Sequence, residues 1–211
     1  MFLQDWEVRI DRLKCSPFSY EDIADLLHLS FDEHIAEGLH FTCSSMTAST
    51  FREKTRDSIV LVAWNPMDDS ILGTMTVTVK KDNKQAVYGY LEYLAISPDA
   101  KRLGLGTRLL QACTDCCIGG KYLLSDTATE AKSSVNWHLK NGFKIVGLES
   151  YASTNYYSYL FRKQIISPSK WDNNLYVRFH YLLSYIRCKL LKKSDGRRTV
   201  LGKVLSQLFR R

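Results

Sequence analysis

Residues 90–110, YLEYLAISPDAKRLGLGTRLL, constrain this 211-residue chain more than any other stretch. An apolar run ends at Pro98, a short basic loop with two glycines follows, and an apolar helical pattern begins at Leu109. A strand, a glycine loop and a helix start form a common phosphate site, because the free N–H groups of the first helical turn point at the anion. Gly104 and Gly106 would let the main chain approach such a ligand closely. The stretch therefore predicts a phosphate-bearing ligand.

The patterns on either side of this stretch predict an α+β fold with a central mixed, mostly antiparallel sheet flanked by helices. Residues 58–97 contain three apolar or alternating runs joined by short polar turns, which is typical of an antiparallel meander. Residues 30–46 show no regular pattern, and such a stretch often shapes a substrate pocket. We expect strands at 6–13, 58–64, 71–79, 87–97, 122–126, 143–149 and 156–163, and helices at 20–29, 47–56, 107–118 and 133–141.

Charge divides the chain into two parts. Residues 1–169 carry a net charge of −2 and residues 170–211 carry +9, which together give the net charge of +7. We therefore expect a body at 1–166 and a basic helical extension at 167–211.

The extension contains an amphipathic helical pattern followed by a second, shorter one at 201–208. In the first pattern the apolar residues recur at helical spacing, with basic residues beside them. Three interpretations stay open: packing on the body or on a second subunit, docking on an anionic membrane surface, and contact with nucleic acid, which we rank last. The apolar residues of the first pattern are Leu175, Phe179, Leu182, Ile186 and Leu190.

No apolar segment is long enough to span a bilayer, and the first residues become charged too early for a secretory signal. We expect a cytoplasmic protein or one at the cytosolic face of a membrane. The six cysteines fit free thiols there. Cys113, Cys116 and Cys117 lie close together, but no second Cys or His pair stands at ligand spacing, so we expect no metal site.

Two segments together resemble the GCN5-related N-acetyltransferase (GNAT) superfamily. The loop from Ile96 to Gly106 is similar to the family's V-x-P-x-x-[RQ]-x-x-G-x-[GA] acetyl-CoA loop, with Lys101 in the Arg/Gln position. Residues 137–143, WHLKNGF, are similar to its F-Y-x-K-x-G-F segment, with His138 in the Tyr position. A dinucleotide site would need an acidic residue about 20 positions after the loop, and Asp126 satisfies that spacing. The antiparallel meander before the loop argues against that alternative.

The resemblance implies acetyl-CoA as co-substrate. Main-chain groups of one strand would pair with the pantetheine arm and those of the loop would hold the pyrophosphate, while Asn136 would add a contact from the next helix. The residues implied to bind acetyl-CoA are Leu94, Ala95, Ile96, Lys101, Arg102, Leu103, Gly104, Leu105, Gly106, Thr107 and Asn136.

Acyl transfer to an amine needs a base, a donor for the oxyanion and a proton for the leaving thiolate. The resemblance places the oxyanion donor at a strand bulge near Leu94 and gives His138 the role of general acid. Glu92, where relatives often carry an acidic residue, is the candidate base. Each has a simpler interpretation: His138 as a packing residue and Glu92 as a hydrogen-bonding strand residue.

Two hypotheses follow from the resemblance. The first is an N-acetyltransferase that moves the acetyl group of acetyl-CoA to a primary amine of an amino sugar, a small molecule or a protein. The second is a CoA-binding or regulatory module without efficient catalysis, which the absence of the usual Tyr favours.

Overall fold

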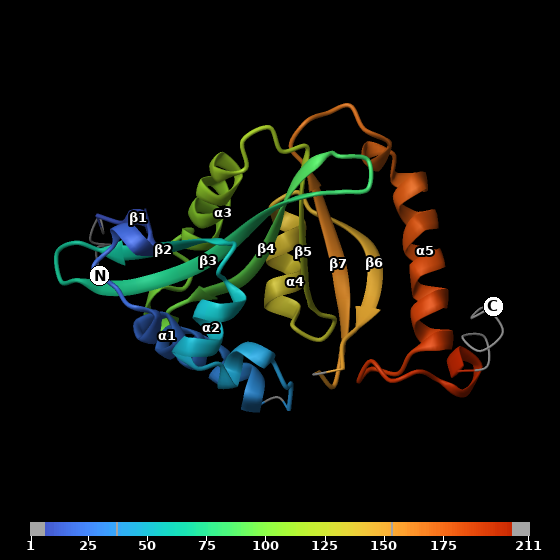
Figure 1. The fold of residues 1–211 in the computed structure, drawn as a ribbon, viewed down its shortest axis with the longest axis horizontal. Coiled ribbons are helices and arrows are strands. Elements are labelled where there is room, and N and C mark those ends of the chain that lie inside the picture. The colour runs from blue at the N-terminus through green and yellow to red at the C-terminus, as the bar shows by residue number, and fades with distance from the viewer. Residues whose placement is uncertain (1–6, 37, 153, 204–211) are drawn as a thin grey trace.

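A seven-stranded sheet runs through the protein and carries helices on both faces (Figure 1). The computed structural model describes residues 7–36, 38–152 and 154–203. The predicted α+β class is confirmed, and the order of the strands and α-helices up to β7 is the one the sequence patterns predict. The strands are β1 (Arg9–Arg12), β2 (Ile59–Asn65), β3 (Ser70–Lys81), β4 (Val87–Ile96), β5 (Tyr122–Ala128), β6 (Lys144–Ser150) and β7 (Tyr157–Gln164). The helices are α1 (Tyr20–Ala36), α2 (Ala48–Lys54), α3 (Leu105–Cys116), α4 (Lys132–Lys140) and α5 (Asn174–Leu191).

The sheet order is β1-β2-β3-β4-β5-β7-β6. Among its described pairs, β4 and β5 run parallel and the others are antiparallel. The parallel neighbours need a crossover, which α3 supplies, whereas the meander β2–β3–β4 uses short turns. The sheet is therefore mixed and mostly antiparallel, as expected.

The two larger apolar clusters of the described residues hold the layers together, one on each face of the sheet. Leu109 and Cys113 of α3 pack against β-strand residues such as Leu91 and Phe161. On the other face, Ile23 and Leu27 of α1 and Phe51 of α2 pack against Val60, Val62 and Ala95. All these side chains are buried, so the central strands are apolar on both faces, which explains their continuous apolar runs.

Helix α1 is longer than the sequence pattern predicts. Its start agrees, because Ser19 Oγ accepts a hydrogen bond from the Asp22 N–H at 3.2 Å, as an N-cap does. It continues beyond residue 29 to Ala36, however, into the stretch expected to be irregular. Tertiary contacts hold the added turns: Ser30 Oγ donates to the Ile96 carbonyl at 3.1 Å and the rings of Phe31 and Phe41 pack at 5.1 Å.

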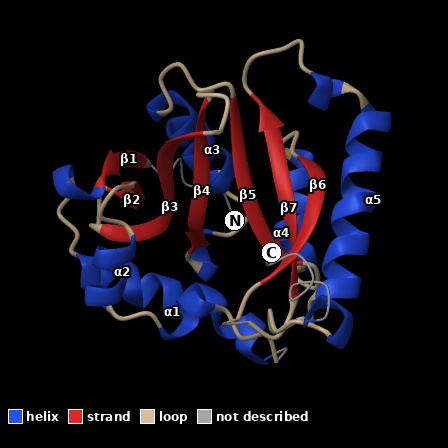
Figure 2. Cartoon of the chain, turned by 45° about the vertical axis from the view of Figure 1, so that its right-hand side comes forward, coloured by secondary structure: helices blue, strands red, loops and turns tan. Residues whose placement is uncertain are grey.

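Helix α5 lies beside β6, at the edge of the sheet (Figures 1 and 2). Ser184 Oγ accepts from the Leu148 N–H at 2.9 Å and donates to the Leu148 carbonyl at 3.1 Å, so α5 satisfies main-chain groups of this edge strand. Gly147 permits the approach, because a Cβ there would lie 2.9 Å from Ser184 Oγ. The second predicted helix reaches only residue 203 within the described chain, and the rest of 201–208 lies outside the described residues. No helix in the described ranges has the length and apolar character to cross a membrane.

Candidate active site

The candidate site is a cleft of about 670 Å³ that lies where β4 and β5 part. The two strands are paired from Tyr88 and Tyr122 to Tyr90 and Leu124, and beyond this point they diverge (Figure 2). Residues 91–96 of β4 and 125–128 of β5 then line opposite sides of the cleft. Main-chain groups of β4 thus face open space, which is the arrangement needed to add an extended ligand as a further strand.

A β-bulge interrupts β4 inside the cleft. Glu92 pairs with Thr76 of β3, but the next paired residue is Ala95 with Thr74, so β4 uses one residue more than β3. The φ angle of Tyr93 is 53°, a left-handed conformation that is uncommon for a bulky residue. The bulge takes Tyr93 and Leu94 out of the ladder with β3. It lies where the resemblance placed an oxyanion donor.

The glycine loop forms one end of the cleft. Lys101, Arg102 and residues 104–107 line it, and α3 begins at Leu105, two residues earlier than predicted. Gly104 has a φ of 73° and its carbonyl accepts from the N–H groups of Thr107 and Arg108 at 3.0 and 3.1 Å. The N–H of Thr107, which we expected to hold a pyrophosphate, is therefore already engaged in the first turn.

An unpartnered donor faces this loop. Trp137 Nε1 is buried and has no hydrogen-bond partner in the described part of the protein. A Cβ at Gly106 would lie 2.8 Å from that nitrogen, so only glycine leaves the space between the indole and the loop. A buried N–H without a partner costs about 1–3 kcal/mol, which a ligand acceptor would recover. A basic loop, a helix start and a spare donor fit a phosphorylated, amide-rich ligand such as acetyl-CoA.

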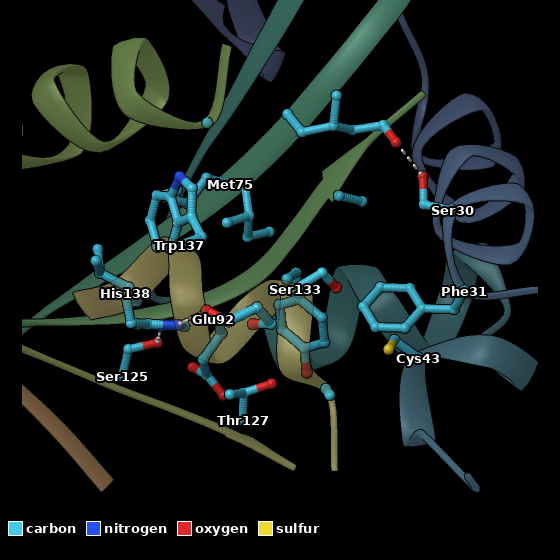
Figure 3. A pocket seen from close by; sticks show the side chains of 18 of the residues that line it. Ser30, Phe31, Cys43, Met75, Glu92, Ser125, Thr127, Ser133, Trp137 and His138 are labelled. Atoms are coloured by element: carbon cyan, nitrogen blue, oxygen red, sulfur yellow. Dashed lines mark hydrogen bonds between the residues drawn. The ribbon is translucent and has the colours of Figure 1, made fainter. Parts of the chain in front are cut away.

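His138 lies in the lining of the cleft, but not as an accessible acid. Its Nδ1 lies 2.7 Å from the Ser134 carbonyl, which can only accept, so Nδ1 carries the proton. Nε2 is then an acceptor for the Ser125 hydroxyl at 3.0 Å, and Figure 3 shows the two side chains pointing toward each other. The ring stacks on Phe161 at 4.3 Å and is 3% exposed.

Burial lowers the pKa of His138 from 6.5 to about 4. At neutral pH the ring is thus uncharged and has no proton at Nε2 to give to a thiolate. The predicted general-acid role is therefore not supported by this geometry, and the packing interpretation fits it better. The sequence could not reveal this, because Ser125 and Phe161 are distant along the chain.

Acidic side chains gather beside the bulge. Glu92 of β4 and Asp126 of β5 both line the cleft, and Figure 3 shows Glu92 extending into it. Burial raises the pKa of each carboxyl. For Glu92 the positive charge of Lys80 opposes this rise in pKa, and the negative charge of Asp126 adds to it. Tyr90 Oη donates to Asp126 Oδ1 at 2.6 Å. Glu92 was predicted as a candidate base, whereas sequence reasoning noted Asp126 only as part of a dinucleotide spacing.

Several predicted residues are placed differently. Leu94, Ala95 and Ile96 line the cleft, but Leu103 packs beside Leu105 and does not. Asn136 is exposed on α4 and lies outside the lining, to which α4 contributes Ser133, Ser134, Trp137 and His138. The cofactor contact expected from Asn136 therefore has no support, and the unpartnered N–H of Trp137 on α4 is a feature that the sequence did not reveal.

The clustered cysteines at the end of α3 belong to the core. Cys113 and Cys117 are buried among apolar residues and burial raises the pKa of both thiols. Within the described ranges there is no group of three or more His, Cys, Asp or Glu side chains that could hold a metal ion.

Comparison with known proteins agrees with the geometry. Residues 56–145 match the family model described as an acetyltransferase (GNAT) domain. No match was found among curated protein sequences. Among solved structures, Ard1 from Thermoplasma volcanium is 16% identical, with a TM-score of 0.54 over 76% of this chain and 99% of that one. The PaiA N-acetyltransferase from Thermoplasma acidophilum, solved with coenzyme A, is 15% identical, with a TM-score of 0.55 over 75% and 99%.

A third similar structure is yncA from Salmonella typhimurium, a putative acetyltransferase solved with acetyl-CoA. It is 12% identical, with a TM-score of 0.57 over 77% of this chain and 96% of that one. At these identities the structures show a shared fold. The family model covers residues 56–145, and this part of the chain matches a GNAT acetyltransferase domain, as the resemblance in the sequence indicated.

Proposed function

We propose that the protein is an acetyl-CoA-dependent N-acetyltransferase that acts on a primary amine by direct attack. The observation that carries the proposal is the bulge of β4, which sets main-chain groups free of the β3 ladder beside the Glu92 carboxyl, inside the cleft that the glycine loop closes. The solved structures with coenzyme A or acetyl-CoA support the choice of co-substrate.

The charges of the cleft suit this pair of reactants. Lys101 and Arg102 line the loop end, where an anionic phosphate group would lie. Glu92 and Asp126 line the part where β4 and β5 begin to diverge, which favours an acceptor that arrives as a cation. The proposed acceptor is accordingly a positively charged primary amine.

Glu92 is the better candidate for the base. The short hydrogen bond from Tyr90 engages Asp126 and stabilises its charged form, whereas Glu92 extends into the cleft. Its raised pKa brings it closer to neutrality, where a base works best. In the proposed reaction, Glu92 accepts the proton of the amine, and the amine nitrogen attacks the acetyl carbonyl of acetyl-CoA. The main-chain N–H of Leu94 stabilises the oxyanion, and the C–S bond then breaks to release CoA as a thiolate, which takes up a proton from water.

His138 provides the argument for the second candidate, a CoA-binding module without efficient catalysis. The resemblance implies a Tyr at this position, and the buried neutral His138 offers no proton in its place. Acid–base groups contribute about 10²–10⁴-fold to such reactions, so a weak enzyme or none is the alternative.

The experiment measures acetyl-CoA binding by calorimetry and thiol release over a panel of primary amines. We expect binding, and turnover that falls about 10²–10⁴-fold in Glu92→Gln. Because Glu92 acts as a base only when ionised, wild-type kcat should fall as the pH drops through its raised pKa, and Glu92→Gln should lose this acid limb. Glu53→Gln, an exposed change of the same chemistry on α2, is the matched control.

Three results decide between the candidates. Turnover that depends on Glu92 supports the enzyme. Binding without thiol release on any amine favours the module, and the absence of binding contradicts both.

A further inference from the structure

We propose that α5 docks this protein on an anionic lipid surface through an apolar face that the fold leaves exposed. This apolar stripe consists of Leu175, Phe179, Leu182, Ile186 and Leu190, each between 44% and 76% exposed. Leu183 widens it and is also half exposed. Aliphatic and aromatic side chains in such a row are unusual on the surface of a soluble monomer and indicate a contact surface.

The body of the protein uses the opposite side of the helix. Val177 and Cys188 are buried, and Ser184 between them bonds to β6. At 100° per residue these positions face away from the stripe, whose centre lies near Phe179 and Ile186. Helix α5 thus packs on the body, which was one of the three interpretations. It does so through the side that carries Val177, Ser184 and Cys188, and not through the apolar stripe.

Both borders of the stripe are basic. Arg178 and Lys189 lie along one border and Arg187 along the other, and all three are exposed. Arg187 and Lys192 both form ion pairs with Glu149 of β6. Lys189 Nζ lies 3.6 Å from the centre of the Tyr157 ring. Arg178 takes part in none of these contacts. Helix α5 itself contains no Asp or Glu. An apolar face between basic borders is the pattern of helices that lie in a membrane interface.

Charge decides between lipid and a second copy of this chain. A copy seated on the stripe, in either direction, would bring one basic border against another, which costs free energy. An anionic bilayer instead attracts both borders while it takes up the apolar side chains. The surface lies on the far side of β6 and β7 from the β4–β5 cleft in the sheet order, so docking does not block the cleft.

The test sediments the full-length protein with vesicles of phosphatidylcholine, alone or with phosphatidylserine. We expect binding to the vesicles that contain phosphatidylserine, and weakening by salt. The double variant Leu182→Glu/Ile186→Glu should bind at least about a hundredfold more weakly, because two apolar anchors are lost. Arg178→Gln should bind about fivefold more weakly, which is the share of one basic residue near an anionic surface.

Ile118→Glu is the matched control, because Ile118 is an exposed apolar residue at the end of α3. It should bind as wild type does, and all variants should keep the wild-type melting temperature, since the changed side chains are exposed. Vesicle binding that the double variant retains would overturn the proposal. So would a wild-type dimer that binds no vesicles and that the double variant converts to a monomer.

Discussion

Protonation of His138 should destabilise the fold in acid, and the structure gives the size of the effect. The folded-state pKa of about 4 lies below the ordinary value of 6.5. The unfolded chain therefore binds this proton first, so the stability is fully present above about pH 6.5 and is lost as the pH falls toward 4. The difference between the two pKa values corresponds to about 3 kcal/mol of unfolding free energy in total. About 2–3 kcal/mol of this stability is lost by pH 4.5.

Urea unfolding of wild type and His138→Phe at about pH 7.5 and 4.5 isolates this contribution. Phe keeps the stacking on Phe161 but cannot titrate, and it leaves the Ser125 hydroxyl without its acceptor. At the higher pH we expect the variant to be about 1–2 kcal/mol less stable than wild type. On acidification its free energy of unfolding should fall by about 2–3 kcal/mol less than that of wild type. His40→Gln, at an exposed position, should behave as wild type. Equal losses in wild type and His138→Phe would refute the assignment of a buried, neutral ring.

Two further substitutions test the loop and the sheet edge. Gly106→Val places a side chain against Trp137 Nε1, so we expect the free energy of unfolding to fall by about 1–3 kcal/mol. Calorimetry should show a correspondingly weaker Kd for acetyl-CoA. Gln111→Val, an exposed change on the same helix, should leave the Kd unchanged. Ser184→Ala removes both hydrogen bonds to Leu148, and urea unfolding should show a loss of about 1–2 kcal/mol; a loss within error would mean that α5 does not hold the edge of β6.

The sequence determined the features that depend on neighbours along the chain. The glycine loop, the start of α1 at Ser19 and the meander were predictable, because turn chemistry, capping and alternation are local. Together with the segment at 137–143 they were enough to indicate the GNAT fold.

Tertiary structure alone decided how individual side chains are used. The charge state of His138 depends on its burial, to which the ring of Phe161 contributes, and the space beside the unpartnered Trp137 Nε1 depends on Gly106. A residue's own type does not carry this information, because desolvation and hydrogen-bond partners come from other segments.

Helix α5 shows the same division. The sequence revealed its apolar stripe correctly, but not that this stripe would face away from the body. Packing on β6 is decided by close approach, and the small Ser184 opposite Gly147 permits it where the leucines would not fit. The sequence therefore shows which residues are apolar. Which of them become buried depends on the shape of the neighbouring elements in the fold.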